Sequence, residues 1–242
     1  MAMPGSATTW LWFGFIGMTL GTGYFLIQSR KARTDQQKLF VVTTLIPAIA
    51  AVSYFALITG YGVISMPISG YGTVDIYWGR YVDWLLTTPL LLLDLTLIAK
   101  AERKTIYKLL GADLVMILGG LAGTMAPPDA PVRIAWWSLS TAAFIVLLYY
   151  LLGALSRRAA DYSSQTGSLF DTLRNLTLAV WSLYPLVWIA GTTSGFGLIT
   201  FGVETALYTS LDLVAKIGFG TILFAHQDAL VQTVQATTRD EV

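Results

Sequence analysis

The sequence predicts an all-α integral membrane protein, built as a bundle of seven transmembrane helices. Hydrophobic residues make up 55% of the 242 residues and charged residues only 12%, and the mean hydropathy is +0.64. Such a chain is too apolar for an ordinary surface in water. Apolar runs of about 20 residues, the length that crosses about 30 Å of hydrocarbon, recur along it. Basic residues gather in alternate connections between these runs, as expected for cytoplasmic loops.

The apolar runs define the predicted helices in chain order. They cover Thr8–Gln28, Leu39–Gly60, Asp75–Ala99, Thr105–Met125, Val132–Leu155, Leu169–Gly191 and Thr200–Ala225. The connections are short and either polar or rich in Gly and Pro, as in RKARTDQQK, MAPPDAP and GTTSGFG. We therefore expect one domain over residues 1–242, with a polar and loosely held tail at 227–242.

Two further segments of the chain have simple interpretations. The N-terminus lacks the basic segment of a secretory signal, so the first apolar run is expected to stay in the protein. The glycine-rich stretch GYGVISMPISGYG has neither the lysine nor the spacing of a phosphate-binding loop. It is predicted to be an external turn or a short hairpin.

The distribution of Lys and Arg predicts the orientation. Twelve of the fifteen lie in or beside the connections after the first, third and fifth apolar runs or in the tail, whereas only Arg133 lies on the opposite side. The N-terminus is therefore expected outside the cell and the C-terminus in the cytoplasm of a multi-pass plasma membrane protein. The remaining two basic residues, Arg80 and Lys216, lie within predicted helices and away from these connections.

Composition disfavours several classes of function. The net charge is +1 and no basic stripe with interleaved aromatic residues is present, so nucleic acid is not an expected partner. Without cysteine there is no disulfide, thiolate metal site or thiol nucleophile. His226, the one histidine, cannot form a zinc site by itself. It lies at the end of the last apolar run, where a cation favourably meets a helix C-terminus, and is interpreted as structural.

Ionisable side chains inside the third apolar run point to function. Arg80, Asp83, Thr87, Leu91 and Asp94 follow one another at steps of three, four, four and three residues, which places them on one helix face. This face extends over about 21 Å, most of the hydrocarbon thickness. Charged groups at such depth are costly and turn toward the protein interior, where they usually have a role.

Lys216 in the last run suggests a covalent ligand. An amine in apolar surroundings loses its proton readily, which makes it nucleophilic toward an aldehyde and suits formation of a Schiff base. Asp212, four residues earlier on the same face, and Asp83 are the candidate counterions of the resulting cation. Further acidic residues are Glu204 near the outer end of this run and Asp113 in the fourth.

The alternative is that these charges only pair to hold the bundle together. Asp94 argues against it, because it lies within the apolar stretch LLLLDL with no basic partner within helical reach. Such a carboxyl is expected to remain protonated at neutral pH and to store a proton.

Aromatic residues offer a wall for a flat apolar ligand. Trp181, Tyr184 and Trp188 share one face of the sixth run around Pro185, which is expected to bend the helix. Trp84 adjoins Asp83, and the pair of residues 136–137 adds two more rings from the fifth run. Most other aromatic residues are assigned to packing or to the membrane interface.

Three segments carry a resemblance to a known family. YWGRYVDWLLTTPLLLLDL, RNLTLAVWSLYPLVW and LDLVAKIGFG resemble the microbial (type 1) rhodopsins, specifically the haloarchaeal bacteriorhodopsin-like branch, and the match extends through essentially the whole chain. The resemblance implies all-trans retinal bound to Lys216 as a protonated Schiff base, with Asp83 as counterion and proton acceptor, and Asp212 as second counterion. It further implies that Thr87 bonds to Asp83, Arg80 governs the external side and Asp94 donates protons from the cytoplasmic side.

The resemblance also implies the retinal pocket and a preferred assembly. The residues that match the pocket are Trp84, Thr88, Leu91, Met116, Trp137, Ser140, Thr141, Trp181, Tyr184, Pro185, Trp188 and Ala215, with Tyr54 and Asp113 as supporting groups. Membrane lipids are the expected surroundings, and the family resemblance favours trimers.

The leading functional hypothesis is a light-driven outward proton pump rather than an enzyme. Asp83 lies nearer the external end of the third run and Asp94 nearer the cytoplasmic end, which gives proton transfer a direction. The branch resembled has a pair of external glutamates for proton release, whereas only Glu204 is present here, in front of a GTTSGFG loop. That departure weakens the pump hypothesis and indicates late release or another release group.

The alternatives are also explicit. A phototaxis receptor that signals to a membrane transducer would share the photochemistry, but Asp94 and Ala215 are both residues of the pump type. A chloride pump is disfavoured, because that task favours a neutral residue in place of Asp83. A seven-helix transporter or receptor without chromophore would be colourless.

Overall fold

The predicted apolar runs are helices in the computed structural model, which describes residues 5–30, 36–68, 72–127, 130–160 and 164–227. In chain order the elements are α1 (Gly5–Ser29), α2 (Gln37–Ile58), β1 (Ile64–Ile68), β2 (Gly72–Ile76), α3 (Gly79–Ile98), α4 (Arg103–Met125), α5 (Pro131–Tyr150), the π-helical turn η1 (Leu151–Leu155), α6 (Ser156–Ala160), α7 (Ser164–Trp181), α8 (Leu183–Ala190), the 3-10 turn η2 (Thr192–Ser194), α9 (Phe201–Leu213), the π-helical turn η3 (Val214–Gly218) and α10 (Phe219–Ala225).

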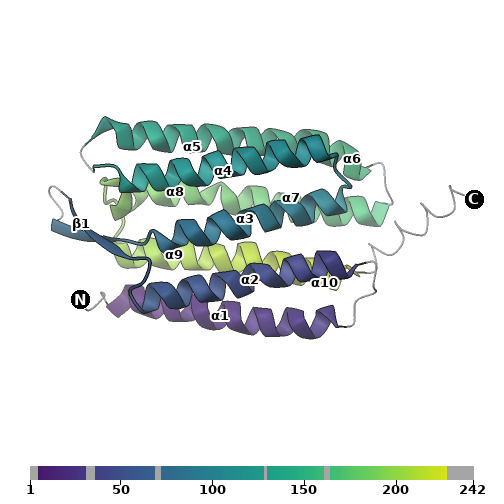
Figure 1. The fold of residues 1–242 in the computed structure, drawn as a ribbon, viewed down its shortest axis with the longest axis horizontal. Helices are drawn as coiled ribbons and strands as arrows, with labels where there is room; N and C mark the ends of the chain where they lie inside the picture. The colour runs from purple at the N-terminus through teal and green to yellow at the C-terminus, as the bar shows by residue number, and fades with distance from the viewer. Residues whose placement is uncertain (1–4, 31–35, 69–71, 128–129, 161–163, 228–242) are drawn as a thin grey trace, which may run out of the picture.

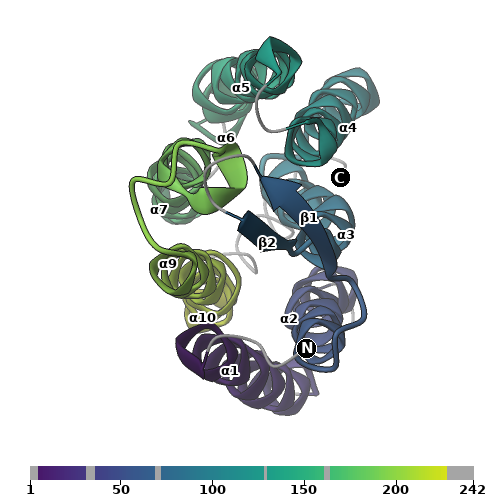
Figure 2. The same cartoon turned by 90° about the vertical axis from the view of Figure 1, so that its left-hand side faces the viewer.

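The helical elements form seven rods within the described residues. The segments α5, η1 and α6 are continuous, as are α9, η3 and α10, and only Ser182 separates α7 from α8. Seen from one end, the rods follow one another in chain order around a ring, and the last packs beside the first (Figure 2). The helices lie side by side along one long axis, and the β1–β2 hairpin lies at the end where α1 begins (Figure 1). The prediction of a seven-helix bundle is confirmed.

Six of the rods contain a helix that is long and apolar enough to cross a membrane. Among the described rods, α7–α8 lacks a single helix of that length and hydropathy. Its first part starts with the polar sequence SQTGSLFDTLRN, and its second part has only 8 residues. The helix α7 nevertheless packs one apolar side inward, through Leu169, Phe170 and Leu173. The helix begins at Ser164, five residues before the predicted start at Leu169, because its first residues are helical but polar.

The third helix also begins elsewhere than predicted. Asp75 belongs to β2, not to the helix, which starts at Gly79. The strands β1 and β2 pair antiparallel, with Ile64 opposite Ile76, and the Ser65 hydroxyl donates to Asp75 Oδ1 at 2.6 Å. The glycine-rich stretch thus forms the short hairpin expected of it. Of the tail expected to be loose, residues 228–242 lie outside the described residues.

The predicted inner face of α3 is confirmed by burial. Arg80, Asp83, Thr87, Leu91 and Asp94 are all buried. A helical period of 3.6 residues places these positions on one side, and that side of α3 faces the centre of the ring. The charged and polar groups that the bilayer would penalise are therefore inside the protein.

Arg133, at the start of α5, joins three segments at the hairpin end of the bundle. Its side chain is 1% exposed and donates to the carbonyls of Thr124 at 2.7 Å, Ala126 at 2.9 Å and Thr193. These carbonyls lie at the C-terminal end of α4 and in η2, so one guanidinium donates to carbonyl groups of both segments. The sequence predicted only that Arg133 lies on the external side, not that it is buried.

Replacing Arg133 with Met should lower the stability of the bundle. The substitution keeps much of the side-chain length but leaves buried carbonyls without donors, at a cost on the order of 3 kcal/mol. The expected result is a lower midpoint of thermal unfolding in detergent, followed by circular dichroism. Arg103→Met, at an exposed position at the start of α4, is the matched control. Equal midpoints for the two variants would contradict the assigned role.

Candidate functional site

The centre of the bundle holds a lysine between two aspartates. Lys216 Nζ donates to Asp83 Oδ2 and lies 3.3 Å from Asp212 Oδ1. All three side chains are at most 3% exposed. Asp83 comes from α3 and Asp212 from α9, so the predicted meeting of two helices at Lys216 is present in the structure.

Lys216 lies in a π-helical turn rather than in regular α-helix. The turn η3 covers Val214–Gly218 and continues into α10 without a break. A π-helical turn inserts one extra residue into the helical register and is often found at functional sites. Asp212, in the last turn of α9, remains within reach of Lys216 Nζ across this widened turn.

The two aspartates have different surroundings. Asp212 accepts hydrogen bonds from the Tyr54 hydroxyl at 2.8 Å, the Tyr184 hydroxyl at 2.7 Å and Trp84 Nε1 at 3.1 Å. The second oxygen of Asp83, Oδ1, is buried and accepts no hydrogen bond from the described residues. Asp212 is therefore a carboxylate fixed by several donors, whereas Asp83 keeps one oxygen available to a proton.

Thr87 bonds to the backbone of Asp83, not to its carboxylate. Thr87 Oγ1 donates to the Asp83 carbonyl oxygen at 2.9 Å, one helical turn away. In the same way Thr88 Oγ1 donates to the Trp84 carbonyl at 2.7 Å, and it also contacts Asp113 Oδ2 at 2.9 Å. Spacing along a helix predicts which residues are neighbours, but not whether a hydroxyl bonds to a side chain or to the backbone.

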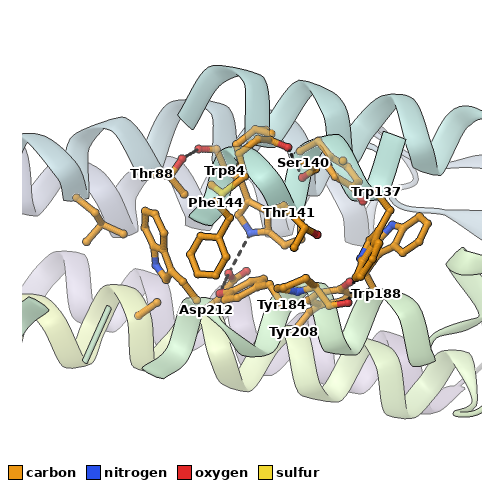
Figure 3. Close-up of a pocket in the computed structure, with 18 of the residues that line it drawn as sticks. Trp84, Thr88, Trp137, Ser140, Thr141, Phe144, Tyr184, Trp188, Tyr208 and Asp212 are labelled. Atoms are coloured by element: carbon orange, nitrogen blue, oxygen red, sulfur yellow. Dashed lines mark hydrogen bonds between the residues drawn. The ribbon is translucent and has the colours of Figure 1, made fainter. Parts of the chain in front are cut away.

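A cavity of about 780 Å³ adjoins this charged centre. Figure 3 shows Trp84 and Thr88 on one side of it, Tyr184 and Asp212 on the other, and Trp137 near one end. The predicted pocket residues that line it are Trp84, Thr88, Leu91, Met116, Trp137, Ser140, Thr141, Trp181, Tyr184, Pro185, Trp188, Ala215 and Lys216. The remaining two, Tyr54 and Asp113, support the wall through Asp212 and Thr88.

The structure adds wall residues that sequence reasoning did not single out. They are Tyr81, Ile117, Gly120, Phe144 and Tyr208. Each is an apolar or aromatic residue of a membrane helix, and nothing in its sequence distinguishes it from a residue that faces lipid. Only helical phase relative to the charged residues could have pointed to them.

The fifth and sixth rods meet at Pro185. Proline has no N–H for the carbonyl four residues earlier, that of Trp181, where α7 ends. Trp137 Nε1 donates to the Pro185 carbonyl at 3.3 Å, which ties the fifth rod to the break. The neighbouring Trp136 is 38% exposed and does not line the cavity. Of the two rings expected from the fifth run, one therefore belongs to the wall.

Asp94 lies farther along the same face of α3. It is fully buried, eleven residues after Asp83, and thus about 16 Å away along the helix axis. Thr43 Oγ1, from α2, donates to Asp94 Oδ2 at 2.8 Å. Sequence reasoning missed Thr43, and the available signal was a hydroxyl inside the apolar second run.

The hairpin side of the centre holds Arg80 and Glu204. The Arg80 guanidinium carbon lies 5.3 Å from the ring centroid of Tyr77 and 4.9 Å from that of Tyr208. Arg80 and Glu204 also line a second cavity of about 320 Å³. A guanidinium held over aromatic rings is stabilised by cation–π attraction.

The Glu204 carboxylate is bound by the turn η2. Its Oε2 accepts from Thr192 N at 2.8 Å, Thr192 Oγ1 at 2.9 Å and Thr193 N at 3.3 Å. Gly191 permits this approach, because a Cβ atom there would lie 2.4 Å from the carboxyl carbon. The acid that the sequence singled out is therefore held by backbone N–H groups.

The arrangement fits a long apolar aldehyde attached to an amine. Aromatic and aliphatic side chains line most of the cavity, and its polar groups are few: Lys216, Asp212 and a few hydroxyls. Ligand pockets generally combine an apolar wall with a small number of placed polar groups. A buried amine with two carboxylates beside it can carry a proton and pass it to one of them.

The chain is similar to known proteins over its whole length. The profile of the family described as bacteriorhodopsin-like protein matches residues 5–230. The bacteriorhodopsin-II-like protein of Haloquadratum walsbyi is 55% identical over an alignment of 243 positions, which covers 100% of this chain and 99% of that protein. The bacteriorhodopsin of a Haloterrigena species is 47% identical over 98% of this chain and 94% of its own.

The fold is also similar to solved structures of rhodopsins and of a light-driven proton pump. The thermophilic rhodopsin from Rubrobacter xylanophilus superposes with a TM-score of 0.87 at 40% identity, covering 94% of this chain and 98% of that chain. The light-driven proton pump LR (Mac) from Leptosphaeria maculans has a TM-score of 0.87 at 31% identity, covering 93% of this chain and 96% of its own.

Replacing Gly191 with Ala should release Glu204 from η2. The added methyl group would overlap the carboxylate, so the hydrogen bonds to the amides of Thr192 and Thr193 should weaken. Hydrogen–deuterium exchange at these two amides is expected to accelerate at least tenfold, which corresponds to about 1.4 kcal/mol. Gly23→Ala, where the added atom meets nothing within 4 Å, is the control. Unchanged exchange in Gly191→Ala would show that the carboxylate is not held there.

Proposed function

Because this chain belongs to the bacteriorhodopsin-like protein family, we propose that it is a retinal-binding, light-driven outward proton pump. The single observation that carries the proposal is the buried group of Lys216, Asp83 and Asp212, with Asp94 about 16 Å farther along α3. The protein is a multi-pass protein of the plasma membrane. It is an ion transporter and photoreceptor, not an enzyme.

Retinal fits the cavity beside Lys216. The Lys216 amine would form a Schiff base with its aldehyde carbon, with loss of water, and the rings of Trp84, Trp181 and Tyr184 would enclose the chain of double bonds. When bound, retinal supplies the absorption of visible light and the change of shape that follows it. The protein supplies the positions at which a proton is held before and after that event.

The first proton transfer runs from Lys216 Nζ to Asp83. Asp83 already accepts a hydrogen bond from Nζ, and its Oδ1 has no donor among the described residues. Asp212 keeps its charge fixed through Tyr54, Tyr184 and Trp84, so the proton has one preferred acceptor. Arg80, one turn from Asp83 on the same helix face, provides a positive charge on the hairpin side.

Asp94 returns a proton to Lys216 Nζ. Thr43 orients this carboxyl, and the surrounding leucines exclude water. A proton can therefore remain on Asp94 until Nζ has lost its own. With the hairpin end outside the cell, as the distribution of Lys and Arg predicts, protons leave through Asp83 and enter through Asp94. The coupling of two carboxyls in different surroundings gives transport its direction.

A phototaxis receptor is the second candidate function. It is favoured by the binding of Glu204 to the amides of η2, where a pump of this branch would be expected to use glutamates for release. A receptor would use the same pigment to shift a helix against a membrane transducer. Trimer formation and contact with a transducer remain expectations from the family resemblance.

Illumination of cells that express the protein with retinal should acidify the medium. The outward movement of protons is the direct product of the proposed mechanism, and a protonophore should abolish the signal. Lys216→Ala removes the amine and should yield a colourless protein without any pH change. A coloured protein that gives no acidification would favour the receptor, and colour retained in Lys216→Ala would refute the assignment of the attachment site.

Asp94→Asn should slow the return of the proton to Lys216. Loss of a positioned acid typically costs roughly 100-fold in proton transfer. The expected result at neutral pH is a correspondingly slow decay of the deprotonated pigment, measured by flash absorption. Thr43→Val should slow it less, because the acid remains but loses its orienting bond. Asp171→Asn, at an exposed carboxyl, is the control, and an Asp94→Asn decay equal to this control would contradict the donor role.

A further inference from the structure

Gly14 on α1 faces the ring of Tyr54 on α2. A Cβ atom at position 14 would lie 2.3 Å from Tyr54 Cε1, 2.5 Å from Cδ1 and 2.8 Å from Cζ. Real Cβ contacts essentially never fall below 3.0 Å. The two helices lie side by side in both views (Figures 1 and 2). The ring can therefore occupy its place only because residue 14 has no side chain.

Tyr54 has little room to move away. It is 3% exposed and packs in a cluster with Leu11, Met18, Ala50 and Leu57. Closely packed interiors transmit a displacement instead of absorbing it. A methyl group at position 14 would therefore push the ring as a whole, and its hydroxyl with it.

The Tyr54 hydroxyl donates to Asp212 Oδ2 at 2.8 Å. The other oxygen of Asp212 faces Tyr184, Trp84 and Lys216, so Tyr54 holds the side of the carboxylate that these groups do not reach. Hydrogen bonds weaken steeply when distance and angle depart from their preferred values. A shift of the ring would thus loosen one of the bonds that orient Asp212.

We propose that Gly14 is a positioning residue for the Asp212 counterion and acts through Tyr54. The inference rests on the proposed function, because its consequence is read from the colour of the retinal pigment. Gly14 does not touch the cavity. Its effect on the counterion depends on a contact between α1 and α2 and on one hydrogen bond.

Other glycines supply matched controls. Gly23, on the same helix, has open space where a Cβ would lie. Gly220, on α10, has the same kind of clash, with the Phe25 ring of α1 at 2.4 Å and, less closely, with Thr43 Cγ2 at 3.2 Å. Phe25 has no hydroxyl, and Thr43 bonds to Asp94 and not to Asp212. Gly220→Ala therefore reproduces the packing strain without the proposed link to Asp212.

The experiment measures the visible absorption maximum of the purified pigment. Tyr54→Phe removes the hydroxyl that bonds Asp212 and should shift the maximum. Gly14→Ala should shift it in the same direction by at least half as much. The double variant Gly14→Ala/Tyr54→Phe should shift it no further than Tyr54→Phe alone. Gly23→Ala and Gly220→Ala should leave the maximum in place.

The outcomes separate this inference from the proposed function. If the unaltered protein forms no pigment, the proposed function fails. If it forms a pigment that pumps but Gly14→Ala matches Gly220→Ala, the positioning role is overturned. A Tyr54→Phe pigment with an unshifted maximum, or additive shifts in the double variant, also overturns it.

A rescue variant covers loss of folding. If Gly14→Ala yields no pigment at all, Gly14→Ala/Tyr54→Leu should restore it, because leucine removes the ring that the new methyl group meets. Recovery of pigment supports the contact with Tyr54 as the cause. Failure to recover it would show that the methyl group clashes elsewhere and would overturn the inference.

Discussion

The ion group of Lys216, Asp83 and Asp212 is the constraint on which the rest of the structure depends. An isolated charge inside the bilayer is costly, and a buried pair is tolerated only when hydrogen bonds and opposite charges surround it. Arg80 lies one turn from Asp83 on the same buried face, so two cations and two carboxylates are enclosed together. The seven rods around them exclude lipid from this centre, and the aromatic wall leaves a cavity against the amine.

The same group explains why its two carboxylates differ. Several donors from three helices hold Asp212, whereas Asp83 is held mainly by Lys216 itself. A carboxylate that depends on one cation responds strongly when that cation moves or loses its proton, while one held by many neutral donors does not. The proposed transfer of the proton to Asp83 rather than Asp212 rests on this difference in hydrogen bonding.

Helical periodicity made much of the site predictable from sequence. The face from Arg80 to Asp94, the Asp212 and Lys216 pair and the rings of the sixth run were all assigned by spacing, and burial and the lining of the cavity agree with them. Periodicity could not predict which side chains of different helices contact one another. Thr43 beside Asp94 and Gly14 beside Tyr54 depend on how α2 meets its neighbours, and Trp136 could not be distinguished from Trp137 without the rotation of α5.

Helix ends were predicted less well, for a physical reason. Hydrophobicity marks where a chain enters the bilayer, but a helix begins where its backbone hydrogen bonds begin, and the two differ at Asp75 and at Ser164.

The later start of α3 brings Asp83 close to the hairpin end of the bundle. Asp83 lies only four residues after the start of α3 at Gly79, about 6 Å along its axis. The proposed proton path from Asp83 to the hairpin end is therefore short and passes Arg80 and the cavity that Glu204 lines. With Glu204 bound by η2, the charge of Arg80 is the nearest group on the same helix face that can respond when Asp83 becomes neutral.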